Sequence, residues 1–259
     1  MAFTGKYRCS ASSFFAGTLL LVLCSGPSFG MTGSALSTVP FVACSSTSGS
    51  KPEKTIKVNL PPTIAKKLAY YYFHGDSIIA PRGWVCNDKN VYGSAWSVFS
   101  VHPKNHKRTV YAISSASVID STIGDQAYIY DWAKTYFPSF VPEIYDAGLG
   151  ILSGRGQKGD IPKFSSDTLK YRSPSRVTYF TPAFSQGIGL KILSEGMYTP
   201  ISSLSQSVPI QGFIDIGTSA CSLSLYALAL PPSLLKIEPY LLTDKERDLD
   251  AIKRADYGC

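Results

Sequence analysis

Residues 210–230 read IQGFIDIGTSACSLSLYALAL and hold two apolar, β-rich runs at 210–216 and 223–230. Short runs rich in β-branched and aromatic residues, bounded by Gly and Pro, are typical of strands. Further runs of this kind lie at residues 77–80, 91–101, 109–113, 177–181 and 190–193. The runs lack the steady alternation of strand and helix that a doubly wound sheet shows. The sequence therefore predicts an α+β fold, with an antiparallel or mixed sheet covered by helices on one side and stapled by disulfides.

Four segments have the apolar spacing or the end residues of helices. Paired prolines precede residues 63–73, where apolar side chains recur at helical spacing. The clearest pattern covers residues 123–137 and ends at Pro138. A short helix is predicted over residues 233–242, followed by a C-terminal helix from about 244 to 256 that begins with a capping box.

The first thirty residues have the three parts of a secretory signal peptide. Lys6 and Arg8 give a positive start, and residues 14–24 form an apolar run. This run is shorter than the roughly 20 apolar residues that cross a bilayer. Small residues at Ser28 and Gly30 suit cleavage after Gly30. We therefore expect a periplasmic or secreted protein of the bacterial envelope, and loss of Lys6 and Arg8 lowers its net charge from +7 to +5.

The rest of the chain is predicted to contain a leader and a single folded domain. Residues 31–55 are rich in Ser, Thr and Gly and are expected to be a flexible leader. Residues 56–259 are expected to form one globular α+β domain. A lipid anchor on Cys44, which follows Ala43 and precedes a polar run, is the alternative to a free exported protein. No transmembrane segment is expected after cleavage.

Four cysteines remain after the predicted cleavage: Cys44, Cys86, Cys221 and Cys259. An even number of cysteines in an exported chain predicts two disulfides, and the sequence leaves all three pairings open. No two of the four have the close Cys-x-x-Cys spacing of a metal-binding pair.

Two short motifs are similar to parts of hydrolase active sites, but both are incomplete. The segment DIGTS at residues 215–219 resembles the aspartic-protease motif, which works with two carboxylates. Ile216 stands where that motif has a hydroxyl residue, and no second copy is present. Gly217-x-Ser219-x-Cys221 lacks the final Gly of a nucleophile elbow, and every histidine precedes Ser219. We interpret the segment as a strand that ends in a glycine turn.

The candidate ligand-binding residues are Arg82, Trp84, His74 and His102. Arg82 would bind an anion and Trp84 would form an apolar wall. In the alternative interpretation, Trp84 packs on a disulfide at Cys86 and Arg82 donates hydrogen bonds to loop carbonyls. His102 and His106 have a spacing that suits zinc on a helix, but Pro103 interrupts it, so no metal site is predicted.

The segment IIAPRGWVC at residues 78–86, followed by YGS at 92–94, is the most distinctive part of the chain. It resembles a group of exported bacterial proteins of unknown function. The resemblance implies no particular activity.

The distribution of charge and the motifs exclude several classes of function. The basic residues are scattered and do not interleave with aromatics as in a nucleic-acid groove, so no nucleic-acid partner is expected. No complete catalytic set and no cofactor motif is present. We expect a non-catalytic protein that binds an envelope component or a small ligand. The alternative is an exported hydrolase with a site assembled from His74, His102 and a distant serine or carboxylate.

Overall fold

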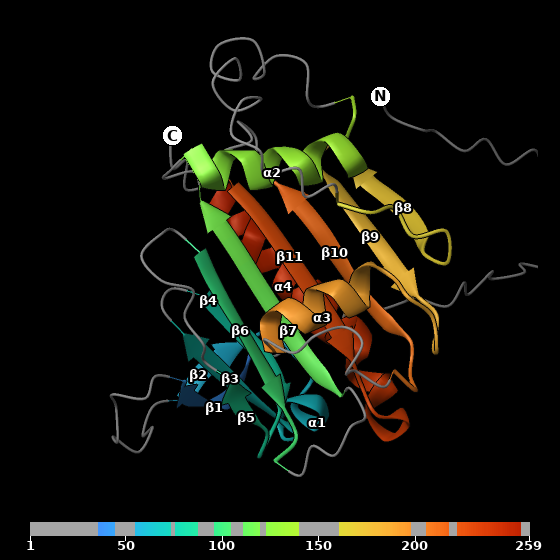
Figure 1. Ribbon diagram of the computed structural model, residues 1–259. Helices are drawn as coiled ribbons and strands as arrows, with labels where there is room; N and C mark the ends of the chain where they lie inside the picture. The colour runs from blue at the N-terminus through green and yellow to red at the C-terminus, as the bar shows by residue number, and fades with distance from the viewer. Residues whose placement is uncertain are drawn as a thin grey trace, which may run out of the picture. The chain divides into compact units, whose positions relative to one another are not determined.

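A computed structural model describes residues 36–44, 55–73, 76–87, 96–104, 111–119, 123–139, 161–197, 206–217 and 222–254. These residues form an α+β fold that is mostly sheet, with one seven-stranded and one four-stranded sheet (Figure 1). The predicted fold class is therefore confirmed. None of the helices in these ranges is long and apolar enough to cross a membrane.

The seven-stranded sheet is antiparallel throughout, in the order β5-β6-β7-β11-β10-β9-β8. The two runs that open the sequence analysis are neighbours near its centre, and Gln211 of β10 lies opposite Leu228 of β11. The strands are β5 (Val85–Asn87), β6 (Trp96–His102), β7 (Ala112–Ile119), β8 (Thr168–Ser173), β9 (Arg176–Thr181), β10 (Ile210–Ile216) and β11 (Ser222–Ala229).

The four-stranded sheet has the order β2-β1-β3-β4 and contains one parallel pair, β1 with β3. Its strands are β1 (Ser37–Ala43), β2 (Thr55–Val58), β3 (Leu68–Phe73) and β4 (Asp76–Pro81). The structure differs here from the expected flexible leader at residues 31–55, because β1 lies within it. Val39 of β1 is fully buried, so a short apolar stretch pairs with distant strands although polar residues surround it.

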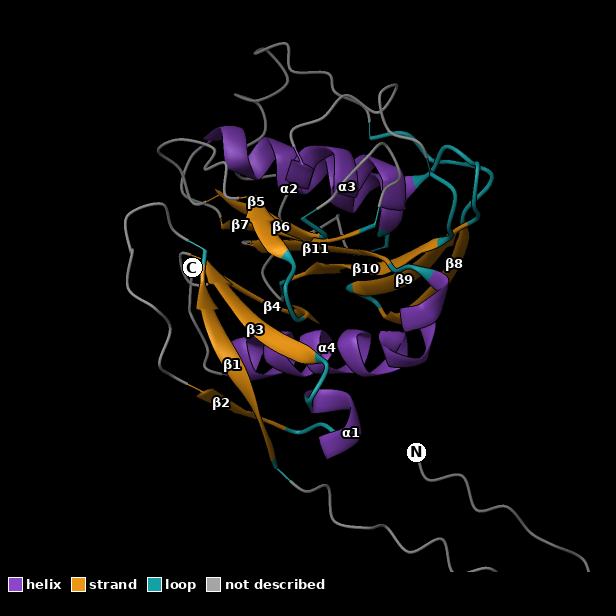
Figure 2. Cartoon of the chain, turned by 90° about the horizontal axis from the view of Figure 1, so that it is seen from below, coloured by secondary structure: helices purple, strands orange, loops and turns teal. Residues whose placement is uncertain are grey.

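The elements are arranged in three layers, which Figure 2 shows from the side. Helices α2 (Ile123–Tyr136) and α3 (Ile188–Met197) cover one face of the seven-stranded sheet. The four-stranded sheet and helix α4 (Glu238–Arg254) cover the other face. The 3-10 helix η2 (Pro232–Ile237) precedes α4, and the short helix α1 (Pro62–Ala65) precedes β3. Helices thus lie on both faces of the large sheet and not on one.

Alternation of side chains along the strands creates two apolar cores. In β11, Leu225 and Ala227 contact the α2–α3 core, whereas Tyr226 and Leu228 contact the α4 core. The sheet is therefore buried on both faces, which explains the near-continuous apolar run at residues 223–230.

Three local predictions are wrong, each for a physical reason. The helix predicted over residues 63–73 ends at Ala65, because Leu68–Phe73 pair with β1 and β4 as strand β3. Residues 190–193 belong to α3 and not to a strand, since Leu190, Ile192 and Leu193 pack on the sheet from one side of a helix. The separate helices at 233–242 and 244–256 are replaced by η2 and one continuous α4.

Candidate functional site

Cys44 and Cys86 form a disulfide whose Cα atoms are 5.6 Å apart, across 42 residues of sequence. Cys44 follows β1 and Cys86 lies in β5, so the bond joins the small sheet to an edge of the large one. The structure shows the bond Cys44–Cys86, which belongs to one of the three pairings that the sequence leaves open. Cys221 and Cys259 lie outside the described residues.

The turn between β4 and β5 contains the residues of the distinctive APRGW segment. The Trp84 amide donates to the Pro81 carbonyl at 3.4 Å, and Gly83 has φ +81°. A left-handed residue at the third position defines a type II turn and favours glycine there. The turn therefore places Arg82 and Trp84 between β4 and β5.

Arg82 and Trp84 are tied to the small sheet around this turn. Arg82 Nε donates to the Leu68 carbonyl at 2.8 Å, while the rest of the side chain is exposed. Trp84 is half-buried and, like Cys86, packs against the α4 core. The Tyr71 hydroxyl donates to the Pro81 carbonyl at 2.9 Å and fixes the turn to β3. Arg82 thus bonds to a carbonyl of strand β3, where the alternative expected a loop carbonyl, and Trp84 packs beside Cys86 on the α4 core.

The candidate histidines do not complete a site with Trp84 among the described residues. His102 ends β6 opposite Val85, and its Nδ1 lies 3.0 Å from the Pro103 carbonyl. Because Val101 and Cys86 contact the α4 core, alternation places His102 on the opposite face of the sheet from Trp84. His74 lies outside the described residues.

A buried polar cluster, here called the α4 network, connects α4 to the sheets. It consists of Asp76, Ser77, Ser115, Lys245 and Asp248. Lys245 Nζ lies 2.5 Å from one oxygen of Asp76, and the Ser115 hydroxyl donates to the other at 2.6 Å. The Ser77 hydroxyl donates to Asp248 at 3.0 Å. Both oxygens of Asp76 are therefore bound, and the cluster positions the helix.

A second ionic contact involves Asp215 of the DIGTS segment. Arg176 Nε donates to Asp215 at 2.5 Å, and Arg176 Nη2 contacts Asp250 of α4 at 2.8 Å. Asp215 is buried near the end of β10, and Gly217 follows the strand. The carboxylate is therefore held in an ion pair, and the segment is a strand end that leads into a glycine.

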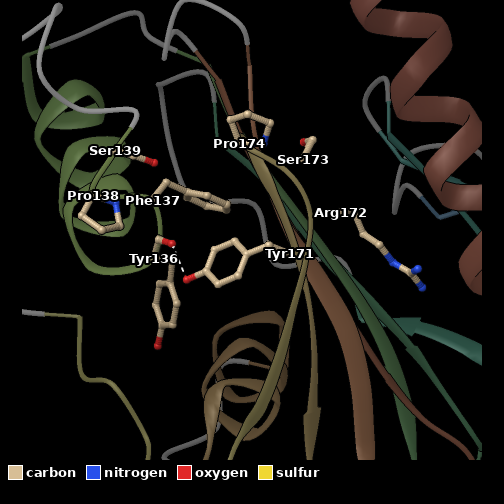
Figure 3. A pocket seen from close by; sticks show the side chains of 8 residues that line it. All are labelled: Tyr136, Phe137, Pro138, Ser139, Tyr171, Arg172, Ser173 and Pro174. Atoms are coloured by element: carbon tan, nitrogen blue, oxygen red, sulfur yellow. Dashed lines mark hydrogen bonds between the residues drawn. The ribbon is translucent and has the colours of Figure 1, made fainter. Parts of the chain in front are cut away.

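A pocket of about 480 Å³ lies between the end of α2 and the β8–β9 hairpin (Figure 3). Tyr171 projects from β8 toward the end of the helix, whereas Arg172 points away from it. The side chain of Tyr171 is 52% exposed, while Tyr136 and Phe137 are each 1% exposed. The described lining residues are aromatic, proline, serine and arginine: Tyr136, Phe137, Pro138, Ser139, Tyr171, Arg172, Ser173 and Pro174.

Hydrogen bonds and ring contacts hold the pocket walls. The Tyr171 hydroxyl donates to the Tyr136 carbonyl at 2.7 Å, and its ring meets Phe137 edge-on with centroids 6.2 Å apart. The Tyr136 hydroxyl donates to the Pro162 carbonyl at 2.8 Å. Burial raises the pKa of Tyr136, so this hydroxyl stays protonated as a donor at neutral pH.

The described residues that line the pocket direct no charged group into it. They include no carboxylate and no histidine, and the guanidinium of Arg172 points outward. Sequence reasoning did not find this pocket, because Tyr171 and Tyr136 are 35 residues apart and belong to no motif. The described part of the chain also contains no group of three or more His, Cys, Asp or Glu side chains that could hold a metal.

Comparison with known proteins identifies no relative, since no family model, no curated protein and no solved structure matches the chain. The resemblance to exported bacterial proteins stays a prediction.

Proposed function

We propose that this chain is an exported, non-catalytic binding protein whose ligand occupies the pocket between α2 and the β8–β9 hairpin. The observation that carries the proposal is a neutral, mainly aromatic and proline lining around an exposed Tyr171. The volume of about 480 Å³ falls within the roughly 300–1,000 Å³ that is usual for small-molecule sites.

The pocket is formed before a ligand arrives. Tyr171 is fixed to the carbonyl of Tyr136, and Tyr136 is fixed to Pro162. Just before β8, Asp167 accepts hydrogen bonds from Thr181 at 2.6 Å and from the Ile188 amide at 2.8 Å. The hairpin is thus tied to α2 and α3, so binding loses little entropy in ordering the walls.

The absence of catalysis is supported by what surrounds the polar groups. A serine nucleophile needs a base within hydrogen-bonding distance. The described lining offers Ser139 and Ser173 but neither histidine nor carboxylate. Asp76 and Asp215, which are largely buried carboxylates, are paired with Lys245 and Arg176.

The proposal of export draws on the Cys44–Cys86 disulfide together with the N-terminal sequence. Stable disulfides are typical of oxidising compartments such as the periplasm. With its sulfur in the disulfide, Cys44 has no thiol for a lipid thioether, which favours a free protein over one anchored through this residue.

Affinity ultrafiltration tests the proposal. Full-chain protein is incubated with the small molecules and soluble glycans of an envelope extract, and retained compounds are identified by mass spectrometry. We expect wild type to retain at least one compound with unchanged mass and the Tyr171→Ala variant to lose it. Tyr240→Ala, which removes a partly exposed tyrosine from α4, is the matched control.

Two results would contradict the proposal. Equal retention by wild type and Tyr171→Ala would show that the pocket is not the binding site. A retained compound that appears only as a cleaved or altered product would favour the exported hydrolase.

A further inference from the structure

We infer that the ligand of this pocket is a neutral saccharide, which stacks one face of a sugar ring on Tyr171. This inference rests on the proposed binding function and adds the chemical class of the ligand. It is carried by the geometry of Tyr171, the polar groups at the pocket edge and the charges around it.

Tyr171 presents ring surface in a fixed orientation. Its hydroxyl is held by the Tyr136 carbonyl at 2.7 Å, and Phe137 meets the ring at an interplanar angle of 85°. Half of the side chain nevertheless stays exposed. The face of an aromatic ring carries partial negative charge and attracts the weakly positive C–H groups of an aliphatic ring. A pyranose has such a C–H face together with polar edges.

The edge of the pocket matches the hydroxyl groups of a sugar. Ser139 and Ser173 can each donate and accept hydrogen bonds. The Tyr136 carbonyl already accepts from Tyr171, and the Ser173 hydroxyl oxygen accepts from the Ser175 amide at 3.2 Å while its own O–H can still donate. The neutral serine hydroxyls suit groups that both donate and accept, as sugar hydroxyls do.

The charges around the pocket disfavour both a cationic and an anionic ligand. A cation would find no carboxylate among the described lining residues, and the chain without the predicted signal peptide carries a net charge of +5. An anion would find no guanidinium, because Arg172 points away from the pocket. A neutral ligand is therefore the class that this lining fits best.

Calorimetric titration of the full chain tests the inference with four probes: triacetylchitotriose, maltotriose, tetramethylammonium and inorganic phosphate. We expect at least one trisaccharide to bind, and Tyr171→Ala to weaken this binding about tenfold, a change that corresponds to the loss of an aromatic contact. Tyr171→Trp, which keeps an aromatic face, should bind within about threefold of wild type, and Tyr240→Ala should be unchanged.

Tyr171→Phe provides a second test in case Tyr171→Ala does not fold. It keeps the aromatic ring and removes only the hydroxyl that donates to the Tyr136 carbonyl. It should bind more weakly than wild type and more tightly than Tyr171→Ala. Tyr171-dependent binding of tetramethylammonium or phosphate without binding of either trisaccharide would overturn the saccharide inference and leave the binding function standing. Trisaccharide binding that is equal in wild type and Tyr171→Ala would also overturn it. If no probe binds and ultrafiltration retains nothing, both the inference and the proposed function fail.

Discussion

On the α2–α3 face of the seven-stranded sheet, a large apolar cluster is buried together with the hydroxyls of Ser100, Ser114 and Thr181, the last of which donates to Asp167. On the opposite face, the α4 network and the Arg176–Asp215 pair are buried beside an apolar core, and the Cys44–Cys86 disulfide closes the edge. The first face is held by apolar packing and by hydrogen bonds to the Asp167 carboxylate, and the second by apolar packing, buried ion pairs and a disulfide. The pocket lies at the rim of the first face, whereas the two buried ion pairs and the disulfide lie on the second.

The largest expected effect comes from Gly212 of β10, on the α2–α3 side. The Tyr179 hydroxyl passes over this residue to donate to the Tyr226 carbonyl at 2.7 Å. A Cβ at Gly212 would overlap that carbonyl and lie 2.5 Å from the Tyr179 hydroxyl oxygen. We expect Gly212→Ala to lower the free energy of unfolding by more than about 4 kcal/mol, measured by urea unfolding.

Gln211→Ala, the adjacent control, should change the free energy of unfolding by less than about 1 kcal/mol. A Gly212→Ala protein of wild-type stability would show that this close contact does not exist.

The second effect tests charge on the α4 side. Lys245→Met leaves Asp76 buried without its cation, and removal of one partner of a buried pair costs about 3–5 kcal/mol. We expect a loss in this range by urea unfolding. The double variant Asp76→Asn/Lys245→Met should recover part of it, because no unpaired charge is then buried. Independent, additive effects of the two changes would argue against the contact.

The third effect concerns the disulfide. Closing a loop across 42 residues stabilises the folded chain by about 2–4 kcal/mol in the chain-entropy view. We expect Cys44→Ser/Cys86→Ser to lower the free energy of unfolding by that amount. If the double variant stays as stable as oxidised wild type, the bond contributes nothing to the fold.

The smallest effect is a pH dependence at α4. Burial, and then the negative charge of Asp248, raise the pKa of Asp244 from 3.8 to about 6, while Arg247 and Lys245 act to lower it. The folded state therefore binds a proton more tightly than the unfolded state, so stability falls as the pH rises from about 4 to 6. Asp244→Asn should gain about 1–2 kcal/mol at pH 8 and almost nothing at pH 4, since the carboxyl is partly solvated. Urea unfolding at the two pH values, with Glu246→Gln as the control, measures the difference. An equal effect of Asp244→Asn at both pH values would refute the shift.

Part of this fold could be predicted from the sequence. The runs that became β9, β10 and β11 and the helix α2 have periodicity and end residues that identify them locally. Strands β1 and β3 could not be found in this way, because Val39 and Tyr71 become buried only through pairing between distant segments. Helix α3 was missed because a short apolar run has no period that separates a buried strand from a buried helix.

The candidate site was harder to predict than the fold. The segment around Arg82 and Trp84 is distinctive as a sequence, yet its turn geometry and carbonyl contacts account for much of that pattern. Tyr171, by contrast, belongs to no motif and gains its setting only when β8 lies beside the end of α2. The spacing of the four cysteines along the sequence could not select a disulfide pairing. Cys44 follows a strand of the small sheet and Cys86 lies in a strand of the large one, so the two meet only when both sheets have formed.

Hydrogen exchange of the full chain, with the Cys44–Cys86 bond oxidised and then reduced, tests most directly whether the pocket on the first face is formed without support from the disulfide on the second. The account predicts faster exchange in β1 and β5 after reduction, with unchanged protection at residues 131–139 and 168–176 around the pocket. Equal loss of protection around the pocket would contradict it, because the pocket would then depend on the disulfide side of the molecule.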